Sequence, residues 1–416
     1  MVNPIDSVRP LTLAQSIDLA LKQTSNYRSS QINELIVSED LRQARAALLP
    51  KVSIPLNLIS TSPSLGTTRP RPPSFVGANA ITEYQALINA AGEIDTSGKL
   101  RATLLRNQAL VESARAGTEV AKRDLIQAVA DAYYNLALST TRRRGAESNL
   151  LAAGEFENIT KLNMEAGEVA PVDLVRARLQ TAARRDELEQ ANADESVSAD
   201  VLRFLVGQNF TEAIAAEDLL TQMPVDDEIQ RFAEAAIRTR PEFAQFEADK
   251  RAAEFDVNIA RSGRRPQLTY SISSGLITDS FRLGHIKDHA GIQATIGFTI
   301  PIFDWGANRS RETQSRLKLQ VAENARSIAE RQFTRVFFTA RTLAVSARAR
   351  IIQLRSSIAD AESNLTASTA RYRAGEAPIN EVVDAQNLLI TQRQALYKAI
   401  FDYQTAKSHL ARAVGQ

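Results

Sequence analysis

Residues 372–386 read YRAGEAPINEVVDAQ, a Gly-Glu turn and a proline followed by the acidic start of an amphipathic helix. Residues 163–177 read NMEAGEVAPVDLVRA, which is nearly the same turn followed by nearly the same helix start. A glycine after one apolar-periodic stretch and a proline before the next mark the end of one helix and the beginning of another. Each stretch therefore predicts the tip of a helical hairpin, and the chain carries this tip twice.

The two tips belong to a longer internal repeat. Pro50 in LLPKVSI aligns with Pro266 in RRPQLTY at an offset of 216 residues, whereas the tips align at an offset of 208. The stretch at 61–77 is rich in Pro, Gly, Ser and Thr, and we expect it to absorb this difference as an enlarged loop. The offset of 208 recurs at three glycine pairs: Gly98 with Gly306, Gly167 with Gly375, and Gly207 with Gly415. We therefore predict a tandem duplication.

The predicted organisation is a first repeat at 1–207, a linker or equatorial segment beside the long helices at 208–227, and a second repeat at 228–416. Each repeat is expected to contain helices, a β-hairpin, a long helix, the tip and a returning helix. The predicted bounds in the first repeat are a hairpin at about 50–97, a long helix at about 98–166 and a returning helix at about 172–206. In the second repeat they are a short helix at 228–240, a hairpin at about 266–303, a long helix at about 306–374 and a returning helix at about 379–414.

Two patterns predict that most of the chain is helical. No proline interrupts 98–167 or 306–375, so either stretch can form one continuous helix. After the second tip, one seam of residues recurs at alternating steps of 3 and 4: Val382, Ala385, Leu389, Gln392, Leu396, Ala399, Tyr403, Ala406 and Leu410. A sustained heptad seam is typical of helices packed as an antiparallel coiled coil.

Four other stretches alternate with a period of two, which predicts β-strands. They are VSIPLNL at 52–58, EYQALINA at 83–90, QLTYSIS at 267–273 and GIQATIGFTI at 291–300. One face of each is apolar and the other carries mainly small or polar residues, as in a transmembrane β-barrel. Four strands are too few to close a barrel, so several chains must share it: two chains give eight strands, and three give twelve with room for a pore.

The composition excludes several other classes of protein. Lysine and arginine number 50 against 48 acidic residues, so the net charge of +2 gives no electrostatic reason to expect a nucleic-acid partner. The absence of cysteine removes disulfides and thiolate sites. His285 and His289 have metal-ligand spacing, but they fall between two strands and are interpreted as a solvated loop. We find no phosphate-binding loop or catalytic constellation, so we predict no enzyme activity, catalytic residue, metal or cofactor.

These features together resemble the trimeric outer-membrane efflux proteins, the TolC-like channels. The resemblance rests on the duplicated plan, the two tips, LLPKVSI and RRPQLTY before strands, and IPIFDWGANRS at 300–310 between a strand and a helix. It implies a homotrimer with a 12-stranded β-barrel in the outer-membrane lipid of a Gram-negative bacterium, continued by a coiled-coil α-helical barrel through the periplasm. Such a protein would be the gated exit duct of a tripartite efflux or type I secretion system.

The resemblance also implies partners. The tips, with Gly167, Glu168, Gly375, Glu376 and Pro378, would meet a periplasmic adaptor. The adaptor would connect to an inner-membrane pump of resistance-nodulation-division, ABC or major-facilitator type. The alternative is a periplasmic coiled-coil adaptor or structural tether without a pore, which would carry compact β-domains instead of hairpins with one polar face.

By the same resemblance, Glu381 and Asp384 match a ring of carboxylates that gates the pore and favours cations. The alternative is that both are ordinary acids of a first helical turn, which the helix dipole favours. Tyr372 and Asp173 match a gate bond, although Ala377 replaces an arginine that the family has near the second tip; simple packing of Tyr372 is the alternative.

Phe303 and Trp305 lie at a strand end, where a belt of aromatic residues at the membrane interface is expected. Buried packing between barrel and helices is the alternative for these two aromatic residues.

Overall fold

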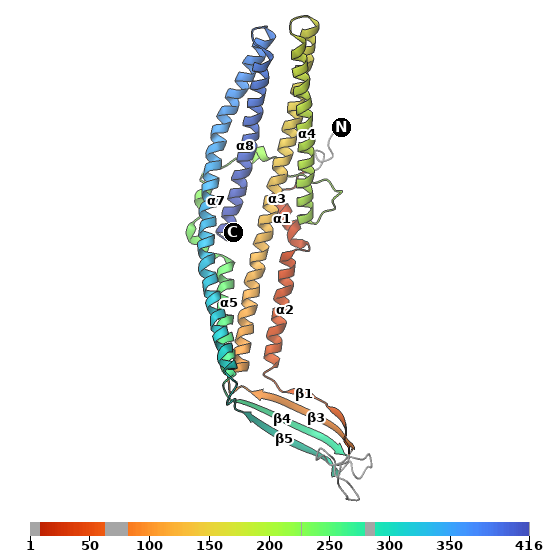
Figure 1. The fold of residues 1–416 in the computed structure, drawn as a ribbon, viewed down its shortest axis with the longest axis vertical. Helices are drawn as coiled ribbons and strands as arrows, with labels where there is room; N and C mark the ends of the chain where they lie inside the picture. The colour runs from red at the N-terminus through yellow and green to blue at the C-terminus, as the bar shows by residue number, and fades with distance from the viewer. Residues whose placement is uncertain (1–8, 63–81, 226, 279–287, 416) are drawn as a thin grey trace. The chain divides into compact units, whose positions relative to one another are not determined.

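A computed structural model describes residues 9–62, 82–225, 227–278 and 288–415 and confirms that the protein is mostly helical (Figure 1). The chain divides into two compact units. The first consists of Met1–Ile32, Ala116–Phe243 and Ser327–Gln416, and the second of Asn33–Arg115 and Ala244–Arg326. His285 and most of the predicted loop at 61–77 lie outside the described residues.

The α-helices are α1 (Leu13–Lys22), α2 (Asn26–Ala46), α3 (Lys99–Glu165), α4 (Pro171–Val206), α5 (Pro241–Ser262), α7 (Ala307–Arg373) and α8 (Ile379–Ala413). Both α3 and α7 are 67 residues long, as the lack of prolines predicts. None of the described helices has an apolar stretch long enough to cross a membrane.

The short helix predicted at 228–240 is not formed as one element. The structure instead has two 3₁₀ segments there, η3 (Ile229–Arg231) and η4 (Glu234–Thr239), after an earlier one, η2 (Leu219–Thr221). Phe232 and Ala233 adopt extended backbone angles between them and interrupt any continuous helix. A helix of this length gains little from its own hydrogen bonds, so local packing decides its form.

The strands are β1 (Lys51–Ser53), β2 (Leu56–Ser60), β3 (Thr82–Ile94), β4 (Gln267–Thr278) and β5 (Ala290–Thr299). β3, β4 and β5 lie side by side in one antiparallel sheet, and β1 and β2 both pair with β3 (Figure 1). Pro55, which has no N–H to donate, separates β1 from β2 and so divides a single edge strand.

The strand register places the predicted apolar residues on one face of the sheet. Ala90 lies opposite both Val52 and Ile272, and Ile296 lies opposite Tyr270. Directly opposite residues in an antiparallel pair share a face. On the other face, polar side chains contact one another across strands; for example, the Ser273 hydroxyl lies 3.1 Å from the Asn89 side-chain oxygen.

The core of the first unit follows the predicted seam of α8. The buried seam residues are Val382, Ala385, Leu389, Leu396, Ala399, Tyr403, Ala406 and Leu410. Tyr403, Tyr133 and Phe337 are among the largest fully buried side chains, and they come from three different helices. The long helices are therefore held mainly by packing of an apolar stripe.

Candidate functional site: the helical tips

Each hairpin tip ends its first helix with the same pattern of backbone hydrogen bonds. At the first tip, the Gly167 N–H donates to the Met164 carbonyl at 3.0 Å and the Glu168 N–H to the Asn163 carbonyl at 2.9 Å. At the second tip, Gly375 and Glu376 donate in the same way to Tyr372 and Arg371, at 3.0 and 2.9 Å. This pairing of donors is the Schellman motif, which satisfies carbonyls at the end of a helix.

The glycines at the tips meet a backbone requirement. Gly167 has a φ of 80° and Gly375 a φ of 75°, in the left-handed region that disfavours other residues. A Cβ atom at either position would meet no atom within 4 Å, so space is not the constraint. Pro378 then leads into α8 with an extended backbone, and the Glu168 and Glu376 side chains are exposed beside the turns.

A small apolar cluster joins the two hairpins near their tips. It consists of Phe156 from α3, Ala177 from α4, Tyr372 from α7, and Ile379 and Val382 from α8. The Phe156 and Tyr372 rings are 5.4 Å apart between centroids. Tyr372 is only 4% exposed, so the packing role weighed for it from the sequence is realised here.

The hydroxyl of Tyr372 is nonetheless unusual. It is buried and has no hydrogen-bond partner among the described residues. Asp173, which the resemblance pairs with it, lies instead 3.8 Å from Arg176 on its own helix. The structure therefore does not join Tyr372 and Asp173. It does place Tyr372 in the same cluster as Ala177, which lies one helical turn after Asp173.

Of the two predicted ring carboxylates, Glu381 is paired and Asp384 is not. A Glu381 oxygen accepts a hydrogen bond from the Arg371 guanidinium at 2.6 Å and lies 3.4 Å from the Ser368 hydroxyl. Asp384 is exposed on the next turn of α8 and has no ion pair within the described part of the chain. Sequence reasoning missed Arg371, although a basic residue in the last turn of a helix is a usual partner for its end.

Phe303 and Trp305 form a separate site in the second unit, between β5 and α7. Their rings pack edge to face at 4.7 Å, and the side chains are 73% and 89% exposed. Asp304 between them accepts hydrogen bonds from the backbone N–H groups of Gly306 and Asn308, at 3.1 and 2.7 Å. This turn holds Trp305 at a φ of 56°, and both rings are largely exposed in the single chain.

The described residues contain no cluster of three or more residues able to hold a metal ion. The tips and the paired aromatic residues offer exposed side chains.

Comparisons with known proteins identify the family of the chain. The family model described as "Outer membrane efflux protein" matches residues 16–208 and 233–416. The toluene efflux pump outer membrane protein TtgC of Pseudomonas putida is 26% identical over 430 residues, which cover 97% of this chain and 82% of TtgC. The cobalt-zinc-cadmium resistance protein CzcC of Cupriavidus metallidurans is 24% identical over 397 residues, covering 94% and 87% of the two chains.

A solved structure shares the fold. The outer membrane protein VceC of Vibrio cholerae superimposes with a TM-score of 0.84 at 20% identity, covering 97% of this chain and 96% of VceC. The resemblance inferred from the duplicated plan, the tips and the strand motifs is confirmed by the family model. Because its model matches most of the residues, the chain belongs to the outer membrane efflux protein family and acts in efflux at the outer membrane of a Gram-negative bacterium.

Proposed function

We propose that three copies of this chain form a gated outer-membrane duct for a tripartite efflux or type I secretion system. One observation carries the proposal: an apolar face of the sheet is left uncovered. Ile292 and Ile296 on β5 are 79% and 77% exposed, and Val52 at the opposite edge is 68% exposed. A contiguous apolar surface of this kind needs a medium to cover it, and lipid is that medium for an alternating strand pattern.

The edges of the sheet support a shared barrel. Of the described strands, β5 pairs only with β4, and β1 and β2 pair only with β3. Unpaired strand edges are not stable in lipid, so the edges of neighbouring copies must pair. With β1 and β2 counted as one divided strand, three copies of this sheet give twelve strands and a pore, whereas two copies give eight strands and a lumen filled by side chains.

The internal repeat and the partners belong to the same proposal. The duplication is supported by the family model, which matches two successive segments, and by the identical hydrogen-bond pattern of the two tips. Six tips per trimer would form the docking surface for a periplasmic adaptor, through Gly167, Glu168, Gly375, Glu376 and Pro378. TtgC is named as part of an efflux pump, which supports an inner-membrane pump of one of the three named types as the second partner.

We propose Glu381 and Asp384 as the selectivity ring. Both lie in the first two turns of α8, so a trimer would bring six carboxylates close to its axis. Crowded carboxylates attract cations and exclude anions. The Arg371 contact neutralises part of this charge at Glu381, which leaves Asp384 as the stronger attractant.

Tyr372 and Asp173 are proposed as a gate pair that forms in one state of the duct. The support is the unpaired, buried hydroxyl of Tyr372, since such a group is costly unless another state supplies a partner. Asp173 lies one turn from Ala177, which contacts the same cluster. The proposed pair forms when α4 moves against α7 so that the hydroxyl and the carboxylate meet.

Single-channel conductance in a planar bilayer tests the proposal. The protein is purified in detergent, and its mass is checked for three chains. Discrete steps that favour cations are expected, and replacing Glu381→Ala with Asp384→Ala should weaken both the cation preference and block by multivalent cations. The matched control is Glu189→Ala with Asp360→Ala, two exposed acids elsewhere on α4 and α7.

The outcomes separate the parts of the proposal. A water-soluble monomer that never conducts would overturn the duct and favour a tether. A conducting trimer whose selectivity is the same in the double variant and the wild type would overturn the ring alone.

A further inference from the structure

We propose that an arginine cluster at one end of the sheet binds the phosphate groups of anionic phospholipid. The cluster is defined as Arg261, Arg264, Arg265, Arg309, Arg311 and Arg316. This inference rests on the proposed placement of the sheet in lipid, and it adds a ligand site to that placement.

The cluster is built by chain segments on both sides of the second hairpin. Residues 261–266 lead directly into β4, and residues 300–306 follow directly after β5. Because Gln267 lies opposite Thr299, both segments meet at the same end of the sheet. Arg261, Arg264 and Arg265 lie at or just after the end of α5, and Arg309, Arg311 and Arg316 lie in the first three turns of α7, so all six come from the segments at this end of the sheet.

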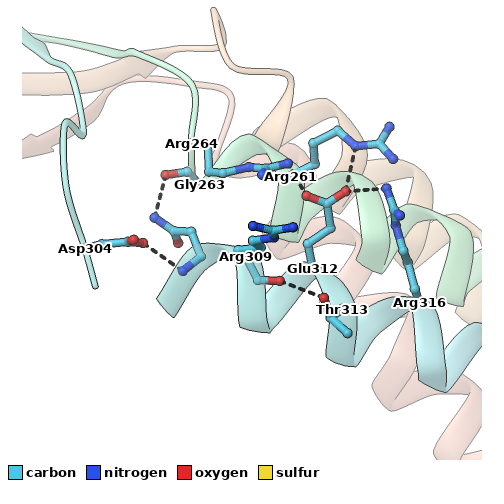
Figure 2. Close-up of polar contacts among 9 residues, drawn as sticks. Arg261, Gly263, Arg264, Asp304, Arg309, Glu312, Thr313 and Arg316 are labelled. Carbon is cyan, nitrogen blue, oxygen red and sulfur yellow. Dashed lines mark hydrogen bonds and ion pairs between the residues drawn. The ribbon is translucent and has the colours of Figure 1, made fainter. Parts of the chain in front are cut away.

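A single carboxylate organises three of these arginines. Glu312, whose side chain is only 7% exposed, accepts a hydrogen bond from Arg316 at 2.7 Å and contacts Arg261 at 3.4 Å, and Arg264 also pairs with it. Figure 2 shows the three guanidiniums arranged around this carboxylate. Burial alone would raise the pKa of Glu312, but the Arg261 hydrogen bond and the positive charges of Arg264 and Arg316 lower it overall.

The arginines keep donors and charge for another ligand. Each guanidinium has five N–H donors, and Glu312 offers only two oxygens. The side chains of Arg261, Arg264 and Arg316 are 41%, 47% and 61% exposed. Arg309 is exposed and has no ion pair within the residues that the structure describes.

The charge balance at this end of the sheet is strongly positive. The segments at 261–266 and 300–316 contain six arginines and two acidic residues, Asp304 and Glu312, which leaves an excess of four positive charges. Asp304 is already engaged with backbone N–H groups of the turn. Arg265 contacts the Ser97 carbonyl at 3.0 Å. The segment around Ser97, residues 93–101, contains two acidic and two basic residues, so it does not change the net charge at this end of the sheet.

The neighbouring surface identifies the anion. The exposed apolar residues of β5 continue into Ile302, Phe303 and Trp305, which are 92%, 73% and 89% exposed. Aromatic residues of this kind gather where lipid chains meet headgroups. The apolar residues of β5 match the acyl chains of a phospholipid, the aromatic residues match the membrane interface, and the arginines match the phosphate groups. A guanidinium group binds phosphate with two parallel hydrogen bonds.

The test uses the full-length protein in a neutral maltoside detergent. Dioleoylphosphatidylglycerol, dioleoylphosphatidylcholine or inorganic phosphate is added, and the thermal unfolding midpoint and the lipid retained in native mass spectrometry are measured. Phosphatidylglycerol alone is expected to raise the midpoint and to be retained. An equal effect of inorganic phosphate would mean that the cluster is a general anion site, which would overturn the lipid assignment.

The decisive variant is Arg309→Gln with Arg311→Gln and Arg316→Gln. A basic residue near an anionic lipid surface changes affinity by roughly fivefold, so the three changes should weaken phosphatidylglycerol binding by about a hundredfold. The double variant Arg309→Gln with Arg311→Gln leaves every contact of Glu312 in place and should still lose about 25-fold. It decides the question if the triple variant does not fold.

The matched control is Arg331→Gln with Arg341→Gln and Arg355→Gln, three exposed arginines of the same helix α7. This control should bind phosphatidylglycerol like the wild type. Wild-type binding by both cluster variants would overturn the inference and would mean that the arginines only fasten α5 to α7. A trimer that conducts but shows no preference for phosphatidylglycerol would refute the lipid site and leave the duct intact.

Discussion

At the scale of single residues, the ion pair between Arg371 and Glu381 has the largest consequence for the proposed selectivity ring. The last turn of α7 places Arg371 beside Glu381 across the second tip, and its guanidinium lies 2.6 Å from the carboxylate. The two side chains are 53% and 34% exposed, so the pair is an ordinary surface ion pair in strength. In the proposed selectivity ring, the positive charge of Arg371 would offset the charge of one of the two carboxylates that each chain contributes.

We predict that Arg371→Gln raises the preference for cations. An exposed ion pair is worth about 1 kcal/mol at most, so the potassium-to-chloride permeability ratio should rise by up to about fivefold. Reversal potentials in a potassium chloride gradient measure this ratio. Arg373→Gln is the matched control, because Arg373 is exposed on the same turn and pairs with no acid in the described residues. If both variants shift the ratio equally, Arg371 has no specific effect on Glu381.

Sequence patterns predict some residues well and others poorly, for physical reasons. The positive φ of Gly167 and Gly375 follows from local backbone chemistry, so a Gly after a helical seam was enough to predict each turn. The contact between Arg371 and Glu381, and the grouping of Arg261, Arg264 and Arg316 around Glu312, depend on how separate segments meet in space. No periodicity in the sequence carries that information.

At the scale of elements, an ion network in the first unit joins α3, the start of α5 and α8. Arg240, just before α5, donates two hydrogen bonds to Glu242, at 2.6 and 3.1 Å. Arg412 in the last turn of α8 contacts Glu242 at 2.8 Å and Asp124 of α3 at 2.6 Å. Burial alone would raise the pKa of Glu242, but the Arg240 hydrogen bonds and the Arg412 charge lower it to about 2.

We predict that Glu242→Gln destabilises the folded protein in a pH-dependent way. The pKa of Glu242 is lower in the folded than in the unfolded chain, so its contribution is fully present above the unfolded value and is lost as the pH falls toward about 2. The shift corresponds to about 3 kcal/mol at pH 7. Denaturant unfolding in detergent at pH 7 and at pH 3 measures the difference between variant and wild type.

The expected result is a large difference at pH 7 that shrinks at pH 3. Glu234→Gln is a suitable control, since Glu234 lies nearby in η4 but takes no part in the network. A difference that stays constant between the two pH values would show that the Glu242 carboxylate is not stabilised by its arginines.

The strands and helices themselves were predicted unevenly. The period of two identified all four strand stretches and their apolar faces, because every second side chain of a strand must share a face. It did not reveal that Pro55 divides the first strand into β1 and β2. The stretch at 228–240 was wrongly predicted as one helix, because Phe232 and Ala233 adopt extended backbone angles that interrupt it.

At the scale of the whole molecule, the main feature is a sheet whose outer edges and apolar face are left uncovered by the described residues of one chain. Its described outer strands each have one free edge, and its apolar face is exposed, whereas the helices of the first unit bury a continuous seam. Charge, composition and helix length could be read from one chain. The proposed number of chains in the barrel could not, because it depends on contacts between copies.

Two adjacent residues of β5 test whether the two faces of this sheet meet different media. Ile296 lies opposite Tyr270 on the apolar face, and Thr295 lies opposite Ser271 on the polar face. We predict that Ile296→Lys destabilises the membrane-inserted trimer by about 2–4 kcal/mol, because a charge near the middle of a strand would face lipid. Thr295→Lys at the same depth should cost far less, since its side chain would face a water-filled lumen. The readout is the yield of heat-resistant trimer in the outer-membrane fraction. Equal losses in the two variants would contradict the assignment of one face to lipid and the other to the pore, and wild-type yields in both would mean that the sheet is not inserted in the membrane.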